Sequence, residues 1–187
     1  MATYLRLNKS ISEKEAKFII SQILSGLKYL SIEKKIIHYD LKPENILFHN
    51  GKIKISDFGL SKKLNENEEN IELTSQGVGT YWYLPPECFN TEKKSNICSK
   101  VDVWSLGVIF YELLYGKKPF ANSLSQEKIF REKVILDARR VDFPQFPSVS
   151  SEGKDFIRKC LEYNVNKRIS ILDAYSCDYI RKSCYNI

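Results

Sequence analysis

Apolar residues recur at helical spacing in the first part of the chain, directly after a polar start signal. Ser12 and Glu15 form an S-x-x-E capping box, which is typical of a helix N-terminus. The apolar stripe that follows consists of Ala16, Ile20, Ile23, Leu24, Leu27 and Leu30. This spacing predicts a long amphipathic helix whose stripe faces the core.

A second stretch, residues 102–115, is apolar nearly all round and is followed by Gly116. Such a segment predicts a helix buried on every side that ends at the glycine. Further apolar patterns predict smaller helices, including one that contains Phe156, Ile157, Cys160 and Leu161. The chain is therefore expected to be mainly α-helical.

Two short apolar runs, residues 45–48 and 52–55, flank His49-Asn50-Gly51. Asn-Gly between such runs is a strong β-hairpin signal, because both residues accept a positive φ. We expect His49 to lie on the turn, in contact with solvent and without a chemical role.

Composition limits the class of protein. The 187 residues are 43% hydrophobic, which suits one folded domain with a real core. Lys and Arg outnumber Asp and Glu by 29 to 23, a net charge of +6. The basic residues occur as the scattered pairs 34–35, 62–63, 93–94, 117–118 and 139–140. This scatter predicts a solvated surface and no direct nucleic-acid binding, with at most mild attraction to acidic substrates or partners.

The cysteines and the apolar segments bear on the compartment. Five cysteines, an odd number without C-x-x-C spacing, predict reduced thiols. No signal peptide is recognisable, and the most apolar stretch, residues 103–115, is too short for a membrane span and contains Glu112. A soluble intracellular protein without membrane contact is the expectation.

Polar residues at fixed spacing carry the chemistry. His38, Asp40, Lys42 and Asn45 fit H-x-D-x-K-x-x-N, and Asp57 begins D-F-G. The two motifs resemble the catalytic loop and the metal-binding motif of eukaryotic protein kinases. Singly, each residue would more simply cap a turn or be solvated, but their joint spacing favours the kinase interpretation.

The resemblance implies ATP-dependent phosphoryl transfer with Mg²⁺, in which protein groups orient the hydroxyl and neutralise charge. Asp40 is then the catalytic base, and Lys42, catalytic as well, stabilises the transferring phosphate. Asn45 and Asp57 are the expected metal ligands. Lysine at position 42 also favours Ser/Thr over Tyr substrates.

The remaining site residues follow from the same resemblance. The residues assigned to the cofactor are Lys42, Glu44, Asn45, Leu47 and Asp57. Structural support is expected from His38 packed under Phe58, from Asp102 bonded to the catalytic-loop backbone, and from a largely buried bridge between Arg168 and Glu87. The hairpin would hold the catalytic loop and D-F-G on rigid elements.

Residues 57–87 resemble an activation segment, ending in Pro85-Pro86-Glu87. A polar run at residues 65–70 argues for a mobile loop inside it. Thr80, the substrate-docking residue by this resemblance, is expected to hydrogen-bond Asp40 and Lys42.

Within the kinases the chain is similar to the tousled-like Ser/Thr family. The supporting segments are residues 36–43, 57–62, 73–77, 79–89 and 100–105. Tyr39, where an arginine is common, and the doubled proline before Glu87 are the selective features. Glu44 departs from the family, which often has glycine there. By analogy alone, membership implies a protein substrate with a Ser/Thr acceptor, a nuclear location, and chromatin or histone-chaperone partners.

Tyr39 cannot supply the bidentate cation with which arginine grips a phosphate on the activation segment. The sequence therefore predicts weak dependence on phosphorylation of that segment. Glu66, Glu68 and Glu69 could replace the phosphate, but a solvated loop is the simpler interpretation.

No glycine-rich loop or V-A-I-K lysine precedes the capping box, so the sequence predicts a partial kinase domain over residues 1–187. It would be a kinase-like large (C-terminal) lobe with a small catalytic hairpin, the small lobe absent and its facing apolar surface exposed. Two functions follow: a Ser/Thr kinase lobe, inactive alone, or a non-catalytic module that docks substrates.

Overall fold

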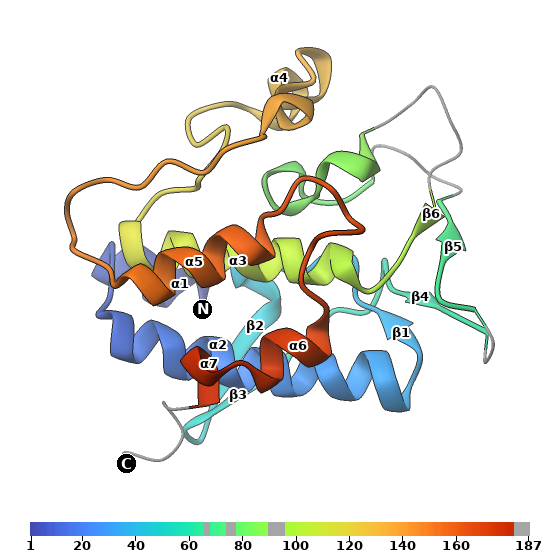
Figure 1. Ribbon diagram of the computed structural model, residues 1–187, viewed down its shortest axis with the longest axis horizontal. Coiled ribbons are helices and arrows are strands. Elements are labelled where there is room, and N and C mark those ends of the chain that lie inside the picture. Colours follow the sequence, from blue (N-terminus) through green and yellow to red (C-terminus); the bar gives the residue numbers. More distant parts are fainter. Residues whose placement is uncertain (66–67, 74–77, 90–95, 182–187) are drawn as a thin grey trace.

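The computed structural model describes residues 1–65, 68–73, 78–89 and 96–181 (Figure 1). The α-helices are α1 (Ala2–Asn8), α2 (Glu13–Lys28), α3 (Lys100–Tyr115), α4 (Gln126–Arg131), α5 (Ser151–Cys160), α6 (Ile171–Ser176) and α7 (Asp178–Arg181). Three two-stranded antiparallel sheets pair β1 (Ile36–Ile37) with β4 (Lys62–Lys63), β2 (Ile46–His49) with β3 (Lys52–Ile55), and β5 (Ile71–Glu72) with β6 (Asn96–Ile97). The described chain is mainly helical, as predicted.

Helix α2 begins where the capping box predicted. Ser12 is the N-cap, and its hydroxyl accepts a hydrogen bond from the Glu15 N–H at 3.3 Å. The Glu15 carboxylate accepts a hydrogen bond from the Tyr4 hydroxyl of α1, so it serves to tie α1 to α2. The apolar stripe is buried, and the helix runs on into a π-helical turn, Tyr29–Glu33.

Helix α3 is the centre of the fold. It lies between α2 and α5, and nearly all of its side chains are buried (Figure 1). Gly107 lets α5 approach closely, because a Cβ there would lie 2.8 Å from the Cys160 Cβ. The helix ends at Gly116 with φ 66°, a left-handed conformation that favours glycine.

The predicted hairpin is formed by β2 and β3. Its turn is shorter than expected, because His49 pairs with Lys52 and only Asn50 and Gly51 lie between the strands. Both turn residues have positive φ, 48° and 71°, as a two-residue hairpin turn requires. His49 is thus the last residue of a strand, although it is exposed as predicted.

Two apolar clusters hold the fold together. The larger one joins α2, α3, α5 and α6. The smaller one surrounds Tyr39 and includes Leu84, Cys88, Phe89 and Ile97, so it fixes the chain after Thr80 against β1.

Cys88, Cys98, Cys160 and Cys177 are free thiols, in line with the prediction, and Cys184 lies outside the described residues. No helix within the described ranges combines the length and the apolar character that a bilayer crossing requires.

Candidate active site

The segment that carries the predicted catalytic residues is anchored to the start of α3. Both carboxylate oxygens of Asp102 accept backbone hydrogen bonds at 2.8 Å, one from the N–H of His38 and one from the N–H of Tyr39. Complete burial raises the pKa of the Asp102 carboxyl, and the two hydrogen bonds and His38 offset part of that rise. The position of Asp40 therefore depends on the most buried helix of the molecule.

Asp40, Lys42 and Thr80 form a hydrogen-bonded triangle. Lys42 Nζ lies 2.6 Å from Asp40 Oδ2 and donates to Thr80 Oγ1 at 3.0 Å. The Thr80 hydroxyl in turn donates to Asp40 Oδ1 at 2.9 Å. The contacts expected of Thr80 are therefore present, and Asp40 is held by two partners from different segments. Lys42 remains 21% exposed, so its ammonium can reach a ligand.

Asn45 is oriented by Asp40. Its amide nitrogen donates to the Asp40 backbone carbonyl at 2.9 Å and lies 3.3 Å from Asp40 Oδ2. Because the NH₂ group is engaged, the amide oxygen is the atom left to face a cation.

Asp57 lies at the same end of the hairpin as Asn45. Ser56 donates from its N–H at 2.9 Å and from its hydroxyl at 3.1 Å to the Asn45 carbonyl, which joins the two strand ends. Asp57 is exposed and has φ 63°, an unusual conformation for a residue other than glycine. An amide oxygen and a carboxylate are hard oxygen donors that suit Mg²⁺, which keeps several waters and phosphate oxygens as further ligands.

His38, for which the sequence predicted a supporting role, lies against Phe58 and Ser56. Its ring lies edge-on to Phe58 with the centroids 5.1 Å apart, and Nε2 lies 3.0 Å from the Ser56 carbonyl oxygen. Ser56, which joins His38 to Asn45, was not among the predicted site residues. A polar residue at the strand end directly before Asp57 was the available signal.

Glu44 and Leu47 are less closely tied to the site. Glu44 is exposed and lines a cavity of about 520 Å³ together with α1, Tyr83, Glu112 and Lys118. Leu47 lies on β2 and is 47% exposed. Among the described residues, no hydrogen bond joins either side chain to Asp40, Asn45 or Asp57.

Arg168 and Glu87 form the expected bridge. The Arg168 side chain is fully buried, and it also donates to the backbone carbonyls of Glu162 and Lys100. Lys100 begins α3, so the bridge connects the segment after Thr80 to the central helix.

Tyr39 is 2% exposed and has φ 68°. Burial raises the pKa of its hydroxyl, which lies against the Cys88 thiol. Its ring therefore packs beneath the segment that contains Cys88 and Phe89. Glu68 and Glu69 of the acidic run are exposed, whereas Glu66, Thr74 and Ser75 lie outside the described residues.

The chain is similar to known proteins over nearly its whole length. The model of the protein kinase domain family matches residues 1–180. The chain is 52% identical over 184 residues to the serine/threonine-protein kinase TOUSLED of Arabidopsis thaliana, with 96% of this chain and 27% of that protein covered. It is 54% identical over 194 residues to serine/threonine-protein kinase tousled-like 2 of Homo sapiens, with 96% and 25% covered.

A third relative, tousled-like 1 of Caenorhabditis elegans, is 53% identical over 187 residues, with 95% of this chain and 19% of that protein covered. The chain thus spans about a quarter or less of the length of these relatives. The family model covers nearly the whole chain and the relatives share about half of its residues, so the chain belongs to the protein kinase domain family and resembles the tousled-like serine/threonine kinases within it.

Proposed function

We propose that this chain is the catalytic part of an ATP- and Mg²⁺-dependent protein serine/threonine kinase. The observation that carries the proposal is the triangle of Asp40, Lys42 and Thr80, which joins a carboxylate, an ammonium and a hydroxyl within 3.0 Å. A pure docking module would not need this group together with the oxygen donors of Asn45 and Asp57.

Each residue has a role in the proposal. Asp40 accepts the hydrogen of the substrate hydroxyl and aims its oxygen, while Lys42 holds negative charge on the phosphate beside it. Asn45 and Asp57 would hold Mg²⁺, which when bound neutralises phosphate charge. Thr80 keeps Asp40 and Lys42 in register and helps to position a Ser or Thr acceptor. Glu44 and Leu47, both exposed beside the loop, would border the nucleotide.

A protein kinase domain contacts the phosphates of its nucleotide from two lobes. Phosphates held by one lobe alone are not clamped, because protein kinases use a glycine-rich loop and a lysine from a second lobe. We propose that the described fold corresponds to the large lobe and that these 187 residues transfer little phosphate alone. Exposed apolar side chains near the site, Leu47, Phe48 and Phe58, fit a surface that the second lobe would cover.

The test compares two forms of the protein. The 187-residue chain is assayed alone and fused behind the ATP-binding lobe of a tousled-like relative, with labelled ATP, Mg²⁺ and a mixed protein substrate. Label on serine and threonine in the fused form, lost in the Asp40→Asn and Asp57→Asn variants, is the expected result. A fused form that neither binds Mg²⁺-ATP nor transfers phosphate contradicts the proposal and favours the docking module.

We also propose that activity depends weakly on phosphorylation of the activation segment, because the buried ring of Tyr39 offers no cation to a phosphate. Thr74→Ala and Ser75→Ala should leave the rate of the fused form nearly unchanged. A large loss, recovered by an acidic residue at either position, would contradict this. Chromatin or histone-chaperone substrates and a nuclear location stay predictions by family analogy.

A further inference from the structure

A basic cavity lies on the outer side of α5, away from the residues of the proposed active site. It measures about 520 Å³, and its polar lining consists of four cationic side chains and two carboxylates beside Tyr163. The charged residues are Arg139, Arg140, Lys154, Arg158, Asp142 and Glu162. No lining residue belongs to residues 38–45 or 57–87.

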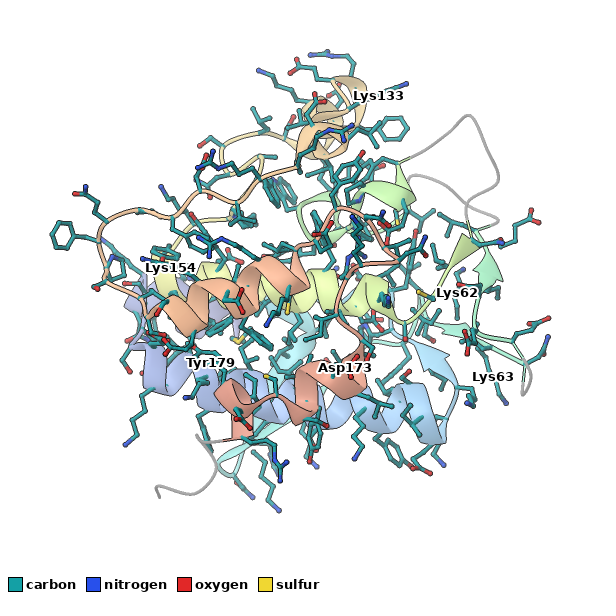
Figure 2. The ribbon with its side chains drawn as sticks, in the orientation of Figure 1. Lys62, Lys63, Lys133, Lys154, Asp173 and Tyr179 are labelled. Carbon is teal, nitrogen blue, oxygen red and sulfur yellow. The ribbon has the colours of Figure 1, made fainter. Side chains whose placement is uncertain are left out.

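The fold gathers these cations from separate parts of the sequence. Lys154 and Arg158 are four residues apart on α5 and therefore share one face of the helix, where Figure 2 labels Lys154. Arg139 and Arg140 come from the segment after residue 137. The sequence predicted that the pair at 139–140 was one of several scattered pairs, but in the folded chain it joins a cluster.

Two of the arginines are held by aromatic rings. The Arg139 guanidinium lies 4.7 Å from the centroid of the Tyr163 ring, and the Arg158 guanidinium lies 4.9 Å from that of Phe143. A guanidinium placed over a ring keeps its N–H edge free, and that edge matches the geometry of a phosphate or carboxylate. Contact with a ring also restricts the rotamers of each arginine before a ligand binds, so less conformational entropy is lost on binding.

The two carboxylates offset only half of the charge of the four cations. Asp142 pairs with Arg140 at 3.5 Å, but both side chains are nearly 90% exposed, so that pair is weak. One carboxylate oxygen of Glu162 accepts a hydrogen bond from the Asn164 N–H. In the part of the chain that the structure describes, Arg139, Lys154 and Arg158 have no ion pair with a carboxylate.

We infer that this cavity binds a phosphorylated serine or threonine in a segment of a partner protein. Its volume is in the range of cavities that bind small ligands. A compact cluster of cations suits a single phosphate, whereas nucleic acid is bound along an extended basic stripe. Val141, Phe143 and Leu161 add an apolar wall, which offers contact to the side chain beside a phosphorylated residue. Arginine clusters are a recurrent means of recognising phosphorylated motifs.

The test is fluorescence anisotropy with the 187-residue chain. The probe is a short labelled peptide with one phosphoserine between leucine and glycine residues, and the comparison peptides carry serine or glutamate instead. The phosphopeptide should bind at least tenfold more tightly than either. The double variant Arg139→Gln and Arg158→Gln should lose at least tenfold in affinity at an unchanged melting temperature. The double variant Arg139→Lys and Arg158→Lys keeps both charges and should retain part of the affinity.

A matched control removes the same charge elsewhere. Lys62→Gln with Lys63→Gln changes β4, which lies far from Lys154 in Figure 2, and should leave the affinity within about twofold. Equal weakening by both double variants would mean general charge attraction and would overturn the inference. The inference would also be overturned if the serine peptide bound equally well, or if inorganic phosphate competed at the same concentration as the peptide. Tighter binding of an oligothymidylate at this site would overturn it as well.

Discussion

Arg168 makes a two-pronged ion pair with Glu87, in which Nη1 lies 2.7 Å from Oε1 and Nη2 lies 2.9 Å from Oε2. Only an arginine offers two parallel N–H groups to one carboxylate. The pair joins the end of the segment 57–87 to a residue that is 81 positions further along the chain.

Removing one partner of this pair should destabilise the protein strongly. Arg168→Met leaves Glu87 without its cation, and we expect a loss of about 3–5 kcal/mol in the free energy of unfolding, measured by urea denaturation. The control is Lys159→Met, which breaks the exposed pair of Lys159 with Asp155 and should cost less than about 1 kcal/mol. Similar losses in both variants would show that the buried pair has no special weight.

Asp102→Asn tests the anchoring of the catalytic loop. Asparagine offers one acceptor oxygen, so one of the N–H groups of His38 and Tyr39 loses its partner. We expect a loss of about 1–3 kcal/mol and faster hydrogen exchange at these two amides. Exchange that speeds up equally along α5 would instead indicate general destabilisation.

Two substitutions at Thr80 separate the effect of losing the hydroxyl from the effect of changing the size of the side chain. In the fused form, Thr80→Val should lower kcat/KM by about 10- to 100-fold, because two hydrogen bonds to charged groups are lost. Thr80→Ser keeps the hydroxyl and should retain most of the activity. A serine variant as poor as the valine variant would assign the effect to the lost methyl group.

Glu13 makes the fold sensitive to acid. Burial by itself raises the pKa of its carboxyl, but hydrogen bonds from Ser150 and Tyr179 outweigh burial, so the pKa lies below its ordinary value of 4.5. The ionised form therefore stabilises the folded state above that value, and this contribution is lost as pH falls through the lowered pKa.

Glu13→Gln should accordingly flatten the fall in the free energy of unfolding between about pH 5 and pH 3. Glu127→Gln, an exposed change on α4, serves as the control and should follow the unmodified protein. Parallel curves for the unmodified protein and Glu13→Gln would assign the acid sensitivity to other carboxylates.

Tyr39 should tolerate loss of its hydroxyl but not a charge. Tyr39→Phe keeps the buried ring, and only a weak contact with the Cys88 thiol is lost, so we expect less than about 1 kcal/mol of change in the free energy of unfolding. Tyr39→Arg would bury a cation and should cost several kcal/mol. A stable, active Tyr39→Arg variant that becomes dependent on phosphorylation would show that the apolar surroundings of residue 39 can rearrange to accept a cation.

Local signals in the sequence predicted the helices and the hairpin well, because each signal acts over a few residues. Ser12 did cap α2, and Asn50-Gly51 did form the turn. The assignment of His49 to the turn was wrong by one residue, since strand pairing, which extends to Lys52, sets where the turn begins.

The site was predictable as far as family motifs reach. The contacts of Thr80 with Asp40 and Lys42 followed from the kinase pattern, whereas the hydrogen bonds from Asn45 to Asp40 were not predicted. The basic cavity was not predictable, because its cations lie up to 19 positions apart and only the packing of α5 against the preceding segment, residues 139–143, brings them together. Charge pairs look scattered in a sequence until the fold gives them a common surface.

Helix α3 concentrates several unrelated requirements in sixteen residues. Asp102 holds the catalytic loop, Ser105 donates to the Tyr83 carbonyl at 2.7 Å, and Gly107 admits α5 at close range. A saturation library of the chain should therefore find its longest intolerant stretch along α3, where substitutions disturb stability and geometry together, and not in residues 38–45, which carry the proposed catalytic groups.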